Sequence, residues 1–111
     1  MIDKAPPKLQ AVTRLMEANL ETPLKLDQLA AGVHISSRQL ERMFRRHLGM
    51  PVIRYYRLLR LRRANVLLNQ TRLTVLEVGL ACGFRSMSQF SRDYRSQYGY
   101  PPIQERFREA S

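Results

Sequence analysis

The sequence predicts an all-α fold of seven helices, in which two helix-turn-helix subdomains are joined by a long linker helix. Apolar residues recur at helical spacing along most of the 111 residues. The segment 26–48 has the pattern of a short helix, a tight turn and an amphipathic helix, and a similar pattern returns in the second half. The predicted divisions are a leader over 1–7, a first subdomain over 8–50, the linker helix over 51–70 and a second subdomain over 71–111.

The first predicted elements are a leader and a packing helix. The leader ends in two prolines, which suit the first turn of a helix because proline has no amide hydrogen to lose there. Apolar residues at helical spacing over 8–20 predict that helix, and its nearly balanced charges indicate that it packs against the rest of the fold. Thr22-Pro23 is expected to end the helix, because the residue before a proline avoids helical geometry.

The segment 26–48 has two apolar faces separated by a break. Apolar residues at i, i+3, i+4 and i+7 define a first short helix, and Gly32 to His34 interrupt the pattern. Ser36 or Ser37 suits the N-cap of a second helix, because a serine oxygen can accept an amide hydrogen two or three residues later. This second helix is apolar on one face and rich in arginine and glutamine elsewhere. The apolar residues are Leu26, Leu29, Ala30 and Val33, then Leu40, Met43, Phe44 and Leu48.

The linker helix begins after Gly49, which suits the position past a helix end, and Pro51, which suits the start of the next helix. Apolar residues lie on nearly every side of it. This pattern is typical of a helix that is buried or touches two partners. Arg57 and Arg60 project close to its apolar side, so they need carbonyl or acidic partners, or must reach phosphate.

The second subdomain repeats the first. Thr74 suits the N-cap of a short helix whose apolar residues are spaced as in the first unit, at an offset of 75 − 26 = 49. From Ser86 the offset becomes 86 − 36 = 50, so the turn has gained one residue. Residues 101–109 are expected to form a short closing helix. Matching pairs include Gln39/Gln89, Leu40/Phe90, Arg42/Arg92, Phe44/Tyr94, Arg45/Arg95, Gly49/Gly99 and Pro51/Pro101.

One position departs from this repeat. Gly83 stands in the second turn where His34 stands in the first. The chain tends to need a positive φ at this position, which glycine adopts without strain. Histidine tolerates positive φ better than most residues do. We therefore expect that His34 carries mild strain, or else that its turn has a different shape.

The basic charge is concentrated in the middle of the chain. The net charge is +10, and of the 19 basic residues all but three are arginines. Residues 34–72 carry ten arginines against Glu41 alone. A planar guanidinium suits phosphate and guanine better than a lysine ammonium does. This placement predicts a surface that faces nucleic acid, and the ordinary alternative is a solvated basic face.

Several classes of protein are disfavoured. No apolar run approaches the ~18 residues needed to span a bilayer, and the first 25 residues lack the apolar region of a signal peptide. Cys82 has no second cysteine to pair with, so we expect a reducing compartment and a core role, with a redox sensor as the weaker alternative. His34 and His47 have no cysteine or carboxylate cluster around them. We therefore expect no metal, no cofactor and no catalytic residue.

The exposed faces of the second helix favour double-stranded DNA as the partner. Arginine can bond guanine O6 and N7 together, and glutamine can do the same to adenine N6 and N7. Residues 36–48 are therefore the candidate recognition helix. If the linker holds both units rigidly, their second helices can enter successive major grooves about 34 Å apart on one face of the duplex. The alternatives are an RNA-binding basic helical module, and a basic amphipathic helix that binds membranes or a partner helix.

The chain also resembles a known family. The stretches that carry the resemblance are LERMFRRHLGMPVIRYYRLLRLRRANVLLNQT and VLEVGLACGFRSMSQFSRDYRSQYGYPP. They resemble the DNA-binding domain of the AraC/XylS transcription regulators over roughly residues 8–108. The wording is similar to a subgroup with an amidotransferase-like sensor domain ahead of this one, which includes regulators of arginine and carnitine-type catabolism. The subgroup implies a C-terminal fragment, with effector and dimer contacts in an N-terminal domain. A small stand-alone regulator is the alternative.

The resemblance further implies partners and contact residues. It implies RNA polymerase as a second partner, no membrane, and a cytoplasmic location on DNA. The second recognition helix is poorer in side chains that read a base with two hydrogen bonds, so we expect the first to discriminate more. The implied base contacts are Arg38, Gln39, Arg42, Met87, Ser88, Ser91 and Arg92. The implied phosphate contacts are Ser36, Arg45, Arg46, Ser86, Gln89 and Arg95.

Overall fold

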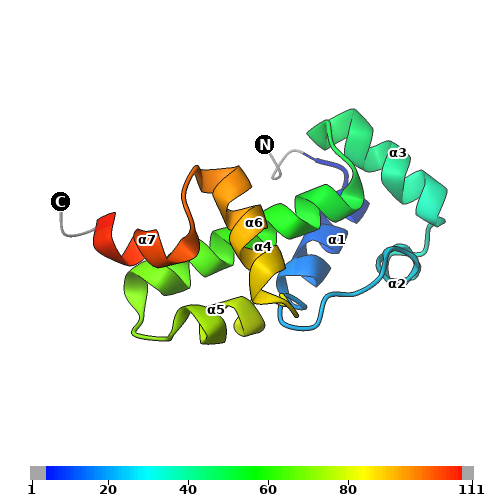
Figure 1. Cartoon of the computed structure of the whole chain (residues 1–111). Helices are drawn as coiled ribbons and strands as arrows, with labels where there is room; N and C mark the ends of the chain where they lie inside the picture. The colour runs from blue at the N-terminus through cyan, green and yellow to red at the C-terminus, as the bar shows by residue number, and fades with distance from the viewer. Residues whose placement is uncertain (1–4, 109–111) are drawn as a thin grey trace. The chain divides into compact units, whose positions relative to one another are not determined.

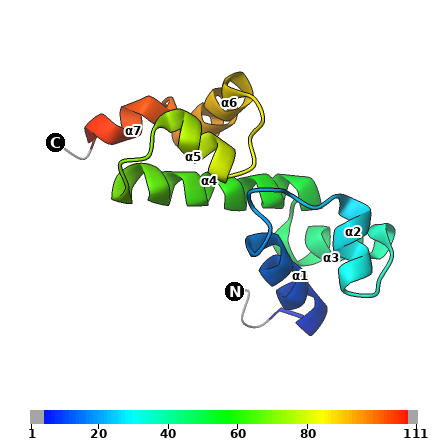
Figure 2. The ribbon, with the colours of Figure 1, turned by 90° about the horizontal axis from the view of Figure 1, so that it is seen from below.

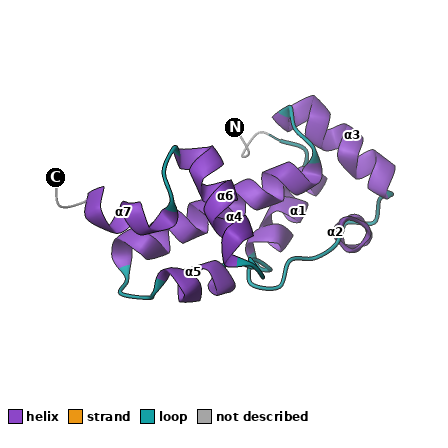
Figure 3. Ribbon diagram, in the orientation of Figure 1, coloured by secondary structure: helices purple, strands orange, loops and turns teal. Residues whose placement is uncertain are grey.

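A computed structural model describes residues 5–108, and all regular structure in that range is helical (Figures 1 and 3). The prediction of an all-α fold with seven helices is confirmed for this range. The helices are α1 Pro7–Glu17, α2 Leu26–Gly32, α3 Ser37–Leu48, α4 Val52–Gln70, α5 Val75–Ala81, α6 Met87–Tyr98 and α7 Pro102–Arg108.

The chain divides into two compact units. The first contains the residues up to Asn19 and Pro23–Arg57, and the second contains Leu20–Thr22 and the residues from Leu58 onward. The division falls inside α4, which is one continuous helix in the ribbon (Figure 2). No one side of α4 is polar along its whole length, because the two ends of this helix contribute to two different cores.

The first helix begins as predicted and ends early. Pro6 is the N-cap of α1 and Pro7 is its first residue, but the helix stops at Glu17 instead of continuing to Leu20. The reason is Asn19, whose side-chain amide donates to the Leu15 carbonyl at 2.9 Å. This contact replaces the backbone hydrogen bond that would extend the helix. The expectation that Thr22-Pro23 ends the helix is therefore wrong.

In the first unit, α1, α2, α3 and the beginning of α4 enclose an apolar core. Tyr56 extends from α4 into this core. Its hydroxyl forms hydrogen bonds at both ends of the loop that joins α1 to α2. It donates to the Asn19 carbonyl and accepts from the Leu24 amide, the latter at 3.1 Å. The buried apolar residues of this unit are Leu9, Val12, Met16, Leu29, Ala30, Val33, Leu40, Phe44, Val52 and Tyr56.

In the second unit, α5 and α6 pack on the later part of α4. The core cluster consists of Leu61, Ala64, Leu68, Val78, Cys82, Phe84, Phe90 and Tyr94. Burial raises the pKa of the Cys82 thiol to about 11, although the charges of Arg63 and Arg60 act in the opposite direction. The thiol is therefore protonated near neutral pH, in keeping with its predicted core role.

The internal repeat is larger than the sequence analysis indicated. Buried residues of α1 at 9, 12 and 16 have the same spacing as those of α4 at 61, 64 and 68. In both units a helix with this buried spacing precedes the helix-turn-helix pair: α1 precedes α2 and α3, and the later part of α4 precedes α5 and α6. The sequence pattern did not reveal the correspondence between α1 and the later part of α4. The start of α4 contributes to the first unit, so the apolar residues of α4 do not form a single face.

Candidate nucleic-acid interface

The turns before α3 and α6 begin with the same backbone hydrogen bonds, and the second turn then contains one more residue, Arg85. The amides of Ile35 and Phe84 donate to the carbonyls of Ala30 and Gly79, at 3.1 and 2.9 Å. His34 adopts a φ of +62°, close to the +84° of Gly83. The first of the two expectations for His34 thus holds, because histidine occupies the left-handed conformation that glycine adopts at the corresponding position.

Both ends of α3 are fixed by specific contacts. Of the two candidate serines, Ser36 is the N-cap, and its Oγ accepts from the Gln39 amide at 3.1 Å. At the other end Gly49 adopts a φ of +69°. Glu41 then accepts a hydrogen bond from the Val52 amide at 2.7 Å, which ties α3 to the first turn of α4. A carboxylate at that place is also favoured by the positive end of the helix dipole.

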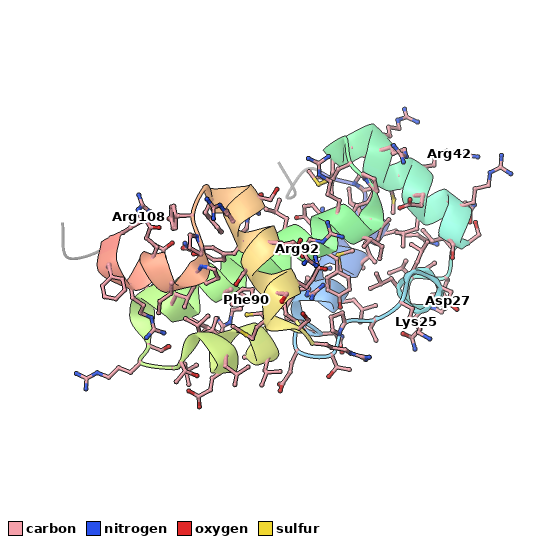
Figure 4. All side chains as sticks on the ribbon, in the orientation of Figure 1. Lys25, Asp27, Arg42, Phe90, Arg92 and Arg108 are labelled. Carbon is pink, nitrogen blue, oxygen red and sulfur yellow. The ribbon has the colours of Figure 1, made fainter. Side chains whose placement is uncertain are left out.

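The buried and exposed faces of α3 are sharply divided. Leu40 and Phe44 are fully buried, whereas the arginines at 38, 42, 45 and 46 are all exposed. None of these four arginines has a hydrogen bond or an ion pair with another residue of 5–108. Arg42 lies on the outer side of α3 in Figure 4. The helix therefore presents a row of unengaged guanidinium groups.

A hollow of about 190 Å³ lies on this face. It is open to solvent, and it is basic because two arginines of α3 and His47 contribute to its wall. Pro6, which precedes α1, closes one side. The lining residues are Pro6, Gln39, Arg42, Met43, Arg46 and His47.

Gln39 is more constrained than the sequence suggested. Its Oε1 accepts from the Ser36 amide at 2.9 Å, which completes a capping box with the serine. Two-point recognition of adenine needs both the oxygen and the nitrogen of the amide. As folded, Gln39 has its Nε2 group available as a donor, while its oxygen caps the helix.

On the corresponding face of α6, polar side chains form hydrogen bonds with one another. Ser86 is the N-cap and accepts from the Gln89 amide at 3.2 Å. The Gln89 side chain turns the other way along the helix, where its Nε2 donates to Asp93 at 2.8 Å. Arg92 in turn donates to Gln89 Oε1 at 2.9 Å. Arg92 is labelled on α6 in Figure 4.

The remaining predicted contact positions of α6 differ in accessibility. Met87, Ser88 and Arg95 are exposed, and Ser91 is half-buried. Ser91 corresponds to Glu41, which is also half-buried on the inner side of α3. Ser91 is therefore the least accessible of the side chains assigned to base reading.

Arg60 is a functional candidate that the site prediction missed. Its Nε and Nη2 donate to the carbonyls of Cys82 and Gly83, at 2.9 and 2.8 Å. Its guanidinium also lies 4.2 Å from the ring centroid of Phe84. The expectation that Arg60 needs carbonyl partners is confirmed. The signal in the sequence was its place beside apolar neighbours on α4, but the partners, 22 and 23 residues away, could not be identified.

A buried polar cluster holds α7 against α6 and α4. Glu105 accepts from the hydroxyls of Tyr94 and Tyr100, at 2.7 and 2.8 Å, and from the amides of Asn65 and Asn69, both at 3.2 Å. Burial alone would raise the pKa of Glu105, but these hydrogen bonds and the charge of Arg108 outweigh it and hold the pKa below its ordinary value. The carboxylate is therefore ionised and well satisfied near neutral pH.

Residues 5–108 also bear on metal binding and on membrane crossing. That range contains no group of three or more histidine, cysteine or acidic side chains able to hold a metal ion. None of its helices combines the length and the apolarity that crossing a bilayer requires.

Known proteins with similar sequences are regulators of transcription. A family model described as a helix-turn-helix domain matches residues 29–108. The transcriptional regulator GbdR of Pseudomonas aeruginosa is 50% identical over 106 residues, which are 96% of this chain and 29% of GbdR. The regulator ArgR of the same species is 45% identical over 100 residues, which are 90% of this chain and 30% of ArgR. The chain thus spans less than a third of the length of these curated relatives.

Solved structures with the same fold extend this likeness. A transcriptional regulator of Chromobacterium violaceum, described as containing an AraC-type DNA-binding domain, has a TM-score of 0.90 and 47% identity. The match covers 95% of this chain and 94% of that one. The DNA-binding domain of AdpA, solved with a target DNA, has a TM-score of 0.86 and 28% identity, with 93% of each chain covered. The chain therefore belongs to the AraC-type helix-turn-helix DNA-binding domains of transcriptional regulators.

Proposed function

We propose that this chain binds double-stranded DNA in a sequence-specific manner, as the DNA-binding part of a transcriptional regulator. The observation that carries the proposal is the exposed face of α3. Its four arginines are unengaged with the rest of residues 5–108, on a helix whose opposite face is fully buried. Such a helix can enter a major groove without losing any contact of its own fold.

The proposal assigns the two recognition helices unequal tasks. On α3, Arg38 and Arg42 contact base edges, and Gln39 contributes its amide nitrogen while its oxygen caps the helix. Ser36, Arg45 and Arg46 contact phosphates. On α6, Arg92 must leave Gln89 to reach a base, so α6 discriminates less. Its other base contacts are Met87, Ser88 and Ser91, and its phosphate contacts are Ser86, Gln89 and Arg95.

We further propose that the two helices occupy successive major grooves of one duplex, so that one chain reads two half-sites. Each unit has its own recognition helix, with a serine N-cap and a left-handed glycine after its end, and this equivalence supports the proposal. The proposed divisions follow from it: a leader over 1–7, reading units over 8–50 and 71–111, and the linker helix over 51–70.

The proposal also covers the setting of the chain. The curated relatives are more than three times as long as the stretch they share with it. We infer that effector and dimer contacts belong to an N-terminal domain outside these 111 residues, of the amidotransferase-like type. RNA polymerase is the second partner, and the protein acts in the cytoplasm on nucleoid DNA. No chemical reaction and no cofactor are assigned to the chain.

A selection experiment tests this function. The chain is incubated with random-sequence duplexes, bound sequences are enriched, and the best site is measured against scrambled duplex and structured RNA at several salt concentrations. We expect one enriched motif with two parts, and a preference for it over both competitors. Structured RNA that competes as well as the motif would instead indicate an RNA-binding module.

A matched pair of charge variants accompanies the selection. Arg46→Ala removes a proposed phosphate contact, whereas Arg14→Ala removes an exposed arginine of α1 that has no proposed contact. We expect Arg46→Ala to weaken all duplexes alike and to lower the slope of log K against log salt by about one. Equal effects of the two variants would show that total charge, and not the face of α3, drives binding.

A further inference from the structure

Arg60 of α4 forms hydrogen bonds with the backbone of the turn before α6. We propose that Arg60 is a positioning residue, which fixes the direction in which α6 leaves that turn and thereby aims the exposed face of α6. The inference rests on the proposed DNA-binding function for its consequence, but the clamp itself is a property of the folded chain. Arg60 does not need to touch DNA for this role.

The geometry of the clamp is two-pronged. The guanidinium donates to two successive carbonyls, those of Cys82 and Gly83, at 2.9 and 2.8 Å. These carbonyls follow the last turn of α5, where backbone acceptors have no partner within the helix. A positive charge is also favoured at this end of a helix. One side chain thus satisfies the carbonyl row at the point where the chain changes direction.

The clamp continues into α6 through two aromatic rings. The Arg60 guanidinium lies over Phe84, whose ring centroid is 4.9 Å from that of Phe90. Phe90 is fully buried on the inner face of α6, and it leaves no room for a β-carbon at Gly79 of α5. The orientation of α6 is therefore coupled to Arg60 through packed side chains, without a flexible segment between them.

The first unit offers a natural comparison. Its turn is reached from α1 by Lys8, whose Nζ is 3.4 Å from the His34 carbonyl in an exposed position. An ammonium is a point charge on a flexible stem, so it does not fix two carbonyls in one geometry as a planar guanidinium does. Ile35 stands in the place of Phe84, so this contact has no stacked ring beneath it. The turn before α3 should therefore depend far less on Lys8 than the turn before α6 depends on Arg60.

The clamp is tested first in the absence of DNA, by amide hydrogen exchange of wild type, Arg60→Gln, Arg60→Lys and Lys8→Gln. In Arg60→Gln we expect exchange to accelerate about 10- to 100-fold from residue 83 to the first turn of α6, since two hydrogen bonds from a charged group are lost. Arg60→Lys should recover only part of the protection. Lys8→Gln should change little. Unchanged exchange in Arg60→Gln would overturn the proposal.

A core variant separates positioning from general loss of stability. Leu68→Ala removes a buried side chain of the same core cluster that makes no hydrogen bond to the turn, because leucine has no polar side-chain group. We expect it to accelerate exchange throughout the second unit, whereas Arg60→Gln acts locally. If Arg60→Gln instead accelerates the whole unit as Leu68→Ala does, Arg60 is a core support and the proposal fails.

Footprinting on the selected duplex tests the consequence. Arg60→Gln should lose about tenfold in affinity through the half-site of α6, at temperatures where both variants are folded, and should keep protection over the half-site of α3. Leu68→Ala should keep both. Equal loss over both half-sites would contradict the proposal. If wild type protects no duplex, the DNA-binding function fails, while the exchange data still decide whether Arg60 holds the turn.

Discussion

The two helix-turn-helix units share a backbone but use their side chains differently. The recognition helices have equal length, bury residues at equivalent positions and end at left-handed glycines. On α3 the arginines extend into solvent, and on α6 the central arginine is bonded to Gln89. One difference beside this is that Asp93 stands where α3 has Met43, and it accepts a hydrogen bond from the Gln89 side chain, which does not cap its helix.

The cores of the two units also differ, because polar side chains contact one another in the second where the first has an aromatic pair. Phe44 of α3 packs edge-on against Tyr55, with ring centroids 5.6 Å apart. At the equivalent positions, 50 residues on, Tyr94 donates to Glu105 at 2.7 Å. An apolar contact in the first unit is thus a buried hydrogen-bonded cluster in the second. The same fold therefore presents arginines to solvent on α3 and hydrogen-bonded side chains on α6. Both are possible because the helix caps and turns, and not the exposed side chains, determine the backbone.

The largest expected effect comes from removing the centre of the polar cluster. Glu105→Ala leaves the hydroxyls of Tyr94 and Tyr100 without their buried acceptor. We expect a loss of about 3 kcal/mol in the free energy of unfolding, measured by urea denaturation. Tyr94→Phe, which copies the first unit at this position, should cost only about 1 kcal/mol. An equal cost for both variants would show that Glu105 is not the centre of the cluster.

The next effect concerns how the two helices of each helix-turn-helix pair fit together. Gly79 faces Phe90 in the second unit, and the buried residues at the corresponding positions of the first unit are Ala30 and the smaller Leu40. A β-carbon at Gly79 would lie 2.8 Å from the buried Phe90 ring. We expect Gly79→Ala to cost about 1–3 kcal/mol in thermal or urea unfolding.

A double variant sharpens this prediction. Gly79→Ala combined with Phe90→Leu recreates the pair found in the first unit. We expect the two changes together to destabilise the protein by less than the sum of the single changes, because they share one contact. Simple additivity would mean that the glycine is present for another reason.

The unequal reading faces can be compared directly with Arg42→Ala and Arg92→Ala. Arg42 is unengaged, so its loss should cost about 1–3 kcal/mol at one base pair of the selected site and little at scrambled sites. Arg92 already has Gln89 as a partner, so its loss should cost less at any base pair. The measurement is the affinity of each variant for duplexes altered one base pair at a time. A greater cost for Arg92→Ala would reverse the assigned roles.

Acid should weaken the second unit selectively. The lowered pKa of Glu105 means that its ionised form is favoured in the folded state. Its contribution to stability is complete above the ordinary carboxyl pKa of about 4.3 and is lost as the pH falls through the lower folded value. We expect the difference in unfolding free energy between wild type and Glu105→Gln to shrink over that range. A difference that stays constant with pH would contradict an ionised Glu105 in the folded protein.

The smallest effect is expected from Asp93. Asp93→Ala releases Gln89 and removes an acidic group from the face of α6, so affinity for duplex DNA should rise about two- to threefold. Asp93→Asn is the matched control, because it removes the charge but keeps an acceptor for Gln89. If both variants bind equally tightly, the charge matters and the tether does not; a fall in affinity for Asp93→Ala would refute the prediction.

Much of the candidate interface follows from sequence pattern because α3 is a local structure. The spacing of Leu40 and Phe44 defines its buried face, and Ser36 and Gly49 mark its two ends. The exposure of Arg42 follows directly from that spacing. The sequence did not predict the hydrogen-bond partners of the Gln39 and Gln89 side chains. A glutamine amide at this position can turn either toward the N-cap or along the helix. Gln39, with Met43 four residues later, turns toward its cap, whereas Gln89, with Asp93 four residues later, turns along its helix.

By itself, the sequence determined the helices, their caps, the duplicated helix-turn-helix pattern and the basic face, because each depends on residues within a turn or two of one another. The tertiary structure alone decided how the two ends of α4 divide between the two units, and which groups Arg60 and Glu105 contact. These features join residues up to 40 positions apart. No local spacing specifies such partners; they are selected when apolar faces pack and leave buried polar groups that must be satisfied.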